Sequence, residues 1–229
     1  MRLTANLFFF IAITAIWLFY ALTTAQVRAT EAPKTLEWED LIPNKELLQN
    51  PLAHLTDEQQ IEMDILAAMR KRIERGELSP VASRYEESIE LTDRLLREGV
   101  AVEILLEQYE QVMQEVERRN AELNRDLDGH LVKIPGYALP LEMVGTLVKD
   151  FLLVPYLGAC IHVPPPPINQ MVMVKLQKPY QTKELYEPVW ISGKLHAKRS
   201  QSNLFYVDGS SNIESGYVLD ATSIQPYAQ

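Results

Sequence analysis

The sequence predicts an α+β protein in which an N-terminal three-helix segment is followed by a small OB-like antiparallel β-barrel. Two observations carry this prediction. Apolar residues recur at helical spacing between residues 56 and 128. After Asp128-Gly129 this periodicity ends, and short β-rich runs bounded by Gly, Pro, Asn and Asp take its place. The OB-like barrel is an economical way to close so many short strands.

The first 29 residues have the form of a secretory signal peptide. An apolar block spans residues 7–22, and the sequences Thr23-Thr24-Ala25 and Val27-Arg28-Ala29 fit a small-x-small cleavage pattern. The alternative is an uncleaved N-terminal anchor, although the block is shorter than the roughly 20 residues that span a bilayer. In a bacterium, both interpretations place the rest of the chain in the periplasm or on the outer face of the inner membrane.

Charge and cysteine content limit the partners of the chain. The formal net charge is -9, from 31 acidic and 22 basic residues. A negative field argues against nucleic acid as a partner and against adhesion to an anionic membrane. The single cysteine excludes an internal disulfide, so in an oxidising compartment this thiol must be buried, bound, used transiently or paired with another chain.

Residues 30–55 are predicted to be a linker and docking segment. Proline and charged residues dominate its first part, and Leu36 to Pro43 contains one aromatic anchor. We expect this segment to pack through Trp38 and Leu41.

Residues 56–128 are predicted to form three amphipathic helices. Thr56 to Gln59 has the form of a capping box that opens the first, and Gly76 ends it. Ser79-Pro80 opens the second, and Gly99 ends it. The predicted buried stripes are Ile61, Ile65, Met69 and Ile73; Val81, Tyr85, Ile89, Thr92 and Leu96; and Leu105, Tyr109, Val112, Met113, Val116, Leu123 and Leu127. We expect the helices to pack on one another, while a partner-binding arm and a homodimer through the long third helix remain alternatives.

Residues 129–229 are predicted to form the barrel domain. The predicted strands are His130 to Ile134, Tyr137 to Glu142, Leu147 to Tyr156, Ala159 to Val163, Met171 to Leu176, Val189 to His196, Asn203 to Val207 and Tyr217 to Ile224.

The segment from Gly158 to Gln170 is the one place where the sequence points to chemistry. The only cysteine, Cys160, stands two residues before His162, and four prolines follow. Prolines exclude a helix, so Cys160 and His162 are predicted to lie on a short strand with their side chains on the same face.

A thiolate and a neutral imidazole are good ligands for zinc or copper(I). The candidate metal residues are therefore Cys160, His162, His196 and His130, with Glu142, Asp208 and Asp220 as further acidic ligands. Two alternatives exist for Cys160. It is either a small buried side chain without chemistry or a nucleophile activated by His162. No motif requires an organic cofactor.

The proline run and its neighbours are the candidate partner or ligand surface. This surface comprises Pro164, Pro165, Pro166, Pro167, Asn169, Gln170, Tyr137 and Tyr156. The alternative is a rigid loop that closes the barrel, with Tyr137 and Tyr156 packing around Cys160.

Three strings in this half of the chain carry a family resemblance. They are Ile134-Pro135-Gly136-Tyr137-Ala138-Leu139-Pro140-Leu141-Glu142, Phe151-Leu152-Leu153-Val154-Pro155-Tyr156, and Gly158-Ala159-Cys160-Ile161-His162-Val163-Pro164-Pro165-Pro166-Pro167-Ile168-Asn169-Gln170. The chain resembles an uncharacterised bacterial exported family, domain of unknown function 3299 (DUF3299), over residues 129–227. Trp38 to Pro43 resembles its upstream docking segment, and the helices between look like an elaboration of this chain.

This resemblance implies an envelope accessory role, since members are secreted and many are encoded beside ABC transporters of the lipoprotein-releasing and macrolide-exporting type, some in settings linked to zinc. It implies no catalytic residues. We therefore expect a non-enzymatic periplasmic adaptor of an ABC-type export system, with a transition metal at Cys160 and His162 as a further expectation. The alternatives are a periplasmic zinc carrier and a cysteine-dependent envelope enzyme.

Overall fold

The computed structural model describes residues 32–77, 79, 83–141, 143–160, 163–184, 186–206 and 209–227. The chain divides into two units, Met1–Ala32 and Pro33–Gln229, and the description below concerns the second. The predicted signal peptide or anchor, residues 1–29, therefore lies outside the described residues. Within these ranges, no helix combines the length and the apolarity that crossing a bilayer requires.

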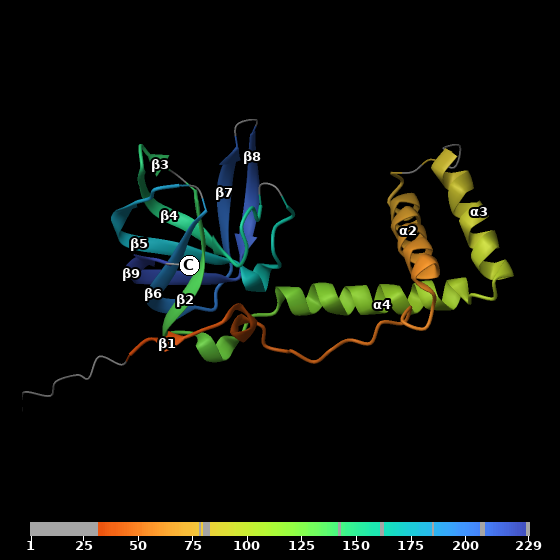
Figure 1. The fold of residues 1–229 in the computed structure, drawn as a ribbon, viewed down its shortest axis with the longest axis horizontal. Helices are drawn as coiled ribbons and strands as arrows, with labels where there is room; N and C mark the ends of the chain where they lie inside the picture. Colours follow the sequence, from red (N-terminus) through yellow and green to blue (C-terminus); the bar gives the residue numbers. More distant parts are fainter. Residues whose placement is uncertain are drawn as a thin grey trace, which may run out of the picture. The chain divides into compact units, whose positions relative to one another are not determined.

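Five strands close into a small barrel (Figure 1). They are β2 (Leu131–Pro140), β4 (Leu147–Val154), β5 (Val172–Gln181), β6 (Glu187–His196) and β9 (Tyr217–Pro226). The pairing order is β2-β6-β9-β5-β4, and β4 returns to β2. This confirms the predicted α+β class with an OB-like barrel.

The barrel is mixed, because one pair of strands is parallel where the sequence predicts an antiparallel barrel. β5 and β9 run parallel, with Val172 opposite Tyr217 and Leu176 opposite Ala221. The chain leaves the barrel after β6, forms the hairpin of β7 (Ser200–Tyr206) and β8 (Gly209–Ser215), and re-enters between β6 and β5. Since β9 runs antiparallel to β6, it takes the direction of β5.

Two short strands extend the sheet, and one glycine permits its curvature. β1 (Lys34–Thr35) pairs with β2, and β3 (Met143–Val144) pairs with β4. The register between β6 and β9 shifts after Ser192. A Cβ at Gly193 would lie 2.3 Å from the Asp220 carbonyl oxygen, so this bulge requires glycine.

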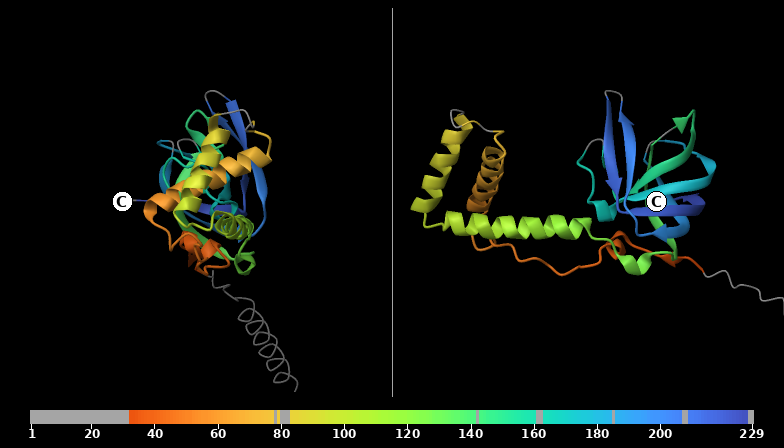
Figure 2. Two further views of the ribbon diagram at one scale, coloured as in Figure 1. Left: turned by 90° about the vertical axis from the view of Figure 1, so that its right-hand side faces the viewer. Right: turned by 180° about the vertical axis from the view of Figure 1, so that it is seen from behind.

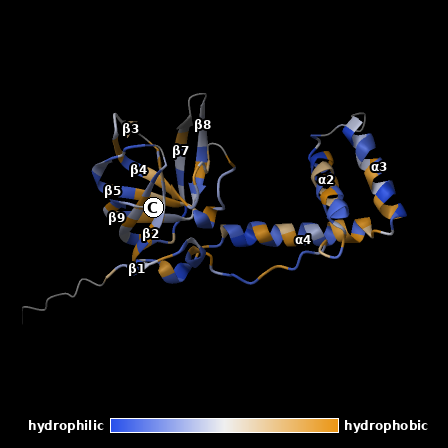
Figure 3. Cartoon of the chain, viewed as in Figure 1, coloured by the Kyte–Doolittle hydropathy of each residue, from blue (hydrophilic) through white to orange (hydrophobic). Residues whose placement is uncertain are grey.

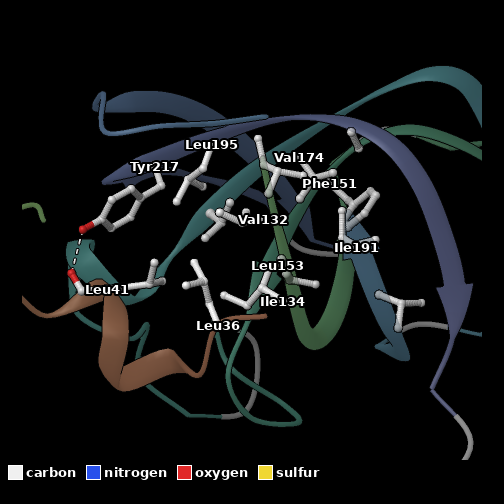
Figure 4. Packing of buried hydrophobic residues seen from close by; sticks show 14 of the residues in the cluster. Leu36, Leu41, Val132, Ile134, Phe151, Leu153, Val174, Ile191, Leu195 and Tyr217 are labelled. Carbon is white, nitrogen blue, oxygen red and sulfur yellow. Dashed lines mark hydrogen bonds between the residues drawn. The ribbon is translucent and has the colours of Figure 1, made fainter. Parts of the chain in front are cut away.

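Alternate residues of the strands fill the interior of the barrel (Figure 4). Val132, Ile134, Phe151, Leu153 and Ile191 are all almost fully buried there. Leu36, which directly follows β1, and Leu41, in the short helix η1 (Trp38–Leu41), add to this core, and Trp38 packs against it. The segment that the sequence predicts to dock through Trp38 and Leu41 thus contributes to the hydrophobic core of the barrel.

The three helices are α2 (Asp57–Glu74), α3 (Ser83–Arg97) and α4 (Val102–Ala121). Thr56 and Gln59 form the predicted capping box at the start of α2. Together with Leu52, Leu55 and Val100, the helices have a separate small core, in which α2 and α3 pack on the first half of α4 (Figure 2). The buried side chains are Leu52, Met63, Leu66, Leu91, Leu95, Val100, Val102 and Leu105.

The predicted stripes of α2 and α3 are correct in part. Met69 is buried as predicted, Ile73, Tyr85 and Thr92 are half-buried, and Val81 lies outside the described residues. Ile61 and Ile65 are exposed, whereas Met63 and Leu66 are buried. On α3, Ile89 and Leu96 are exposed, although the stripe prediction places both in the core. Both sides of these helices carry apolar residues, so the helical spacing alone fits two rows equally well.

The predicted row of α4 divides between two cores. Leu105 packs among the helices, whereas Leu123 and Leu127 belong to the barrel core. Leu123 follows the last residue of α4, and Leu127 lies in the short helix η2 (Arg125–Leu127).

Tyr217 joins both ends of the helical segment to the barrel. Its buried hydroxyl donates to the Leu41 carbonyl at 2.6 Å, as drawn in Figure 4, and accepts from the Asn124 backbone N–H at 2.6 Å. The Asn124 side-chain amide also donates to the Asp40 carbonyl at 2.9 Å. The chain therefore leaves the barrel and returns to it at a single hydrogen-bonded junction.

Candidate functional site

The Cys160 segment is a turn and not the predicted strand. Gly158 and Cys160 have φ of 81° and 68°, and the Val163 N–H donates to the Gly158 carbonyl at 3.3 Å. A left-handed residue breaks the alternation of a strand, so Cys160 lacks the strand conformation on which the prediction rests. His162 lies outside the described residues.

The Cys160 side chain is 8% exposed and belongs to an apolar cluster on the outer face of the barrel. Burial raises the pKa of this thiol to about 11. The thiolate is the form that attacks electrophiles and binds metals, so a protonated buried thiol suits neither role at neutral pH. The geometry favours a packing role for Cys160.

The other candidate ligands do not join Cys160. His196 lies 3.4 Å from Asp220 and 3.8 Å from Asp128, measured to the carboxylate oxygens. His130 lies on the surface, with Nδ1 at 3.2 Å from the Asp128 carbonyl oxygen. Among the described ranges, no group of three or more His, Cys, Asp or Glu residues could hold a metal ion. Glu142 and Asp208 lie outside the described residues.

The proline run is an irregular segment that leads into the short helix η3 (Ile168–Gln170). Pro164, Pro165 and Pro167 are exposed, whereas Pro166 is buried. The exposed Tyr156 donates its hydroxyl to the Pro164 carbonyl at 3.3 Å. Tyr137 is half-buried and packs against the cluster that contains Cys160.

Asn169 and Gln170 connect three parts of the chain. The Asn169 side-chain amide donates to the Arg119 carbonyl near the end of α4 at 2.8 Å, and Asn169 is only 2% exposed. The Gln170 side-chain amide donates to the Trp38 carbonyl at 3.3 Å. The sequence places Asn169 on a partner surface, whereas the structure buries this residue within the chain. Its amide is a second donor to the Arg119 carbonyl, which also accepts the Glu122 N–H at 3.1 Å at the end of α4.

The outer face of β4 and β5 is covered by the chain itself. Ligands of OB-folds bind on the face of their second and third strands, which correspond here to β4 and β5. In this protein Leu152 and Met173 of that face pack with Leu204 and Ile213 of the β7–β8 hairpin. The Ser202 hydroxyl also contacts the Met173 sulfur at 3.5 Å. An OB-type ligand would have to displace this hairpin.

The helical segment, in contrast, has an open groove between α2 and α4 with a volume of about 530 Å³. The groove is lined by Asp64, Ala67, Ala68, Arg70, Lys71, Glu74, Glu103, Leu106, Glu107, Tyr109, Glu110 and Met113. Arg70 donates two hydrogen bonds to the Glu103 carboxylate, at 2.5 and 2.6 Å, which lower the pKa of Glu103. A second hollow of about 340 Å³ lies between α2 and α3 and includes Ile73, Tyr85 and Ile89.

Neither this groove nor the Tyr217 junction is predicted by the sequence. Acidic residues four apart, such as Glu103 and Glu107, were a visible signal, but they fit a solvated helix face equally well. Nothing in the sequence around Tyr217 distinguishes it from other aromatic residues at the start of a strand.

Comparison with known proteins supports one family. The family model of DUF3299, described as a protein of unknown function, matches residues 38–226. The matched range includes the helices, which the sequence analysis interprets as an elaboration of this chain. The crystal structure of a DUF3299 family protein from Pseudomonas aeruginosa PAO1 is 31% identical in sequence, with coverage of 86% of this chain and 98% of that one and a TM-score of 0.45. No curated protein matches the chain.

Proposed function

Since the chain belongs to the DUF3299 family, whose function is unknown, we propose that it is a non-catalytic adaptor of the cell envelope whose helical segment contacts a partner protein. The barrel serves as the scaffold for the helices. The observation that carries this proposal is the exposure of large apolar side chains on all three helices.

These residues are 37–60% exposed, and they are Ile61, Ile65, Ile89, Leu96, Ile104 and Met113. Hydrophobic residues recur along all three helices (Figure 3). Ile61 and Ile65 are one turn apart on α2, and Ile89 and Leu96 are two turns apart on α3. Apolar side chains that gather on an exposed surface characterise protein interaction sites. The helices thus offer apolar surface that their own small core does not use.

The barrel offers less support for chemistry. Its outer β4–β5 face is filled by the β7–β8 hairpin, and the Cys160 thiol is buried with a raised pKa. These features weigh against the zinc carrier and the cysteine-dependent enzyme, because both need an accessible thiolate.

The proposed partner is a subunit of an inner-membrane ABC-type export system, and the proposed location is the periplasm. Support for both comes from the sequence, through the signal-like first 29 residues and the family resemblance. Fractionation of cells that produce the full chain tests the location directly. Recovery of the protein in the cytoplasm would contradict it.

Site-specific photo-crosslinking in living cells tests the adaptor function. A photoreactive amino acid replaces Ile65 or Ile89 on the helices, and Ser210 on the exposed tip of β8 provides the matched control. We expect discrete cross-linked products from the two helix positions, containing the same partner, and none from Ser210. Products from Ser210 alone, or from none of the three positions, would contradict the proposal.

A further inference from the structure

We propose that the groove between α2 and α4 receives a basic amphipathic helix of the partner protein. This inference rests on the proposed adaptor function and specifies the chemistry of the segment that the adaptor binds. Three observations support it: the composition of the groove floor, the length of its α4 side and the sign of its charge.

The floor of the groove is apolar. Ala67 and Ala68 contribute small side chains from α2, and Leu106, Tyr109 and Met113 contribute larger ones from α4. Leu106 and Tyr109 are half-buried, while Met113 is 37% exposed. Small residues on one wall and large ones on the other leave room for apolar side chains of a third helix.

The α4 side of the groove matches the length of a short helix. The α4 lining runs from Glu103 to Met113, whereas α2, which lines the groove from Asp64 to Glu74, runs across α4 (Figure 1). At 1.5 Å per residue, the α4 side is about 15 Å long, which corresponds to about three helical turns. A helix docked in such a groove presents apolar residues at positions i, i+3, i+4 and i+7.

The rim of the groove is acidic. Asp64, Glu74, Glu103, Glu107 and Glu110 face only two cations, Arg70 and Lys71. Both cations already bond to carboxylates, Arg70 to Glu103 and Lys71 to Glu117 at 3.7 Å. The groove therefore keeps a negative field, which favours a segment with lysine or arginine beside its apolar stripe.

The same charge disfavours the other occupants. A second copy of this chain carries a net charge of -9, and its helices present acidic faces of the same sign. An anionic membrane or nucleic acid would also be repelled. A free polycation would satisfy the rim but would leave the apolar floor exposed to water, so the amphipathic helix is the occupant that fits both features.

Binding of synthetic peptides to the purified full chain tests this inference. The probe is a fluorescent peptide of about 14 residues, long enough to form a helix on the surface, with leucine at helical spacing and lysine elsewhere. An isomer of the same composition, in which the two residues alternate, has no apolar helical face. We expect saturable one-to-one binding of the first peptide and at least about tenfold weaker binding of the second.

Two charge-reversed variants locate the binding surface. Glu107→Lys with Glu110→Lys changes the groove rim, and Glu87→Lys with Glu90→Lys makes the same change of charge on the exposed face of α3. We expect the rim variant to weaken peptide binding by about tenfold or more and the α3 variant by less than about twofold. Met113→Ser should weaken binding severalfold without changing its dependence on salt.

Equal effects of the two charge reversals, or equal binding of the two peptides, would overturn the inference, because either result indicates nonspecific attraction of polycations. Peptide-dependent dimerisation would also overturn it. The adaptor function has a separate readout. If cross-links from Ile65 and Ile89 persist while the groove fails to bind the amphipathic peptide, the adaptor proposal stands and the groove assignment falls.

Discussion

The barrel and the helical segment use apolar residues in opposite ways. The barrel buries side chains on both faces of its strands, with Phe151 and Ile191 inside and Leu152 and Met173 beneath the β7–β8 hairpin. The helices bury one narrow stripe and leave side chains such as Ile61 and Ile104 exposed. Burial on both faces favours a stable unit, whereas partial burial leaves surface for a partner. The comparison assigns stability to the barrel and leaves the helices as the surface for the proposed partner contact.

The largest expected effects come from truncations in the two cores. Phe151→Ala should lower the stability of the barrel by about 4 kcal/mol, and Leu66→Ala should lower that of the helices by about 3 kcal/mol, because both side chains are almost fully buried. In a Trp17→Phe background, fluorescence of Trp38 and Trp190 reports on the barrel, and circular dichroism at 222 nm reports on the helices. Urea titration followed by both signals measures the effects.

We expect Leu66→Ala to move the circular dichroism transition to lower urea and leave the fluorescence transition in place. The two signals should separate, which indicates two cooperative units. Coincident transitions in both variants would show that the barrel and helices unfold together. The barrel would then have no stability separate from that of the helices.

Tyr217→Phe should remove about 3 kcal/mol of stability, because it leaves the buried Leu41 carbonyl and Asn124 N–H without their common partner. Tyr85→Phe, on the half-exposed surface of α3, is the matched control and should change stability by less than about 0.5 kcal/mol. Equal midpoints for the two variants in urea would indicate that the junction contributes nothing.

Alkaline pH provides a second test of the junction. Burial raises the pKa of Tyr217 above its ordinary value of 10.0, so the folded state retains this proton more strongly than the unfolded state. Its contribution is present in full below pH 10 and declines as the pH rises through the raised value. Tyr217→Phe should therefore show a weaker loss of stability above pH 10 than the unchanged chain.

Labelling of Cys160 tests whether the barrel contains a reactive thiol. A pKa raised from 9.0 to about 11 lowers the thiolate fraction at pH 8 by about 100-fold, and burial slows access further. We expect the native chain to react with a disulfide reagent at least about 100-fold more slowly than the same chain in urea. Similar rates in both states would restore Cys160 as a candidate nucleophile or metal ligand.

The smallest effect concerns the ion pair on the helices. Glu103→Gln removes the partner of Arg70 at a site where the glutamate is largely exposed, so the helical transition should shift by about 0.5 kcal/mol. The barrel transition should not change. High salt should have a similarly small effect on the unchanged chain, and a loss of several kcal/mol would mean that the pair holds α2 on α4.

Local signals in the sequence predicted much of the fold. The capping box at Thr56 sets the start of α2, and Gly99 follows the end of α3. The alternation in Val189 to Leu195 predicts strand β6. Each of these signals operates within a few residues, so a single sequence contains all the information needed to read them.

The errors concern contacts between distant residues. Ile61 and Met63 are both apolar, and the position of α3 and α4 decides which of them is buried. Cys160 follows a glycine that turns the chain, which strand-like alternation does not reveal. The role of Asn169 depends on a carbonyl 50 positions away in sequence, at Arg119.

The Tyr217 hydroxyl also has a consequence for the modularity of the chain. The hydroxyl bonds both the Leu41 carbonyl oxygen and the Asn124 nitrogen. These two backbone atoms can therefore be no farther apart than the summed lengths of the two hydrogen bonds. A few glycines could bridge that gap at little entropic cost. A barrel without the helical segment could thus be made by joining Leu41 to Asn124 through this short link. A different segment could be inserted at the same point without redesign of the strands.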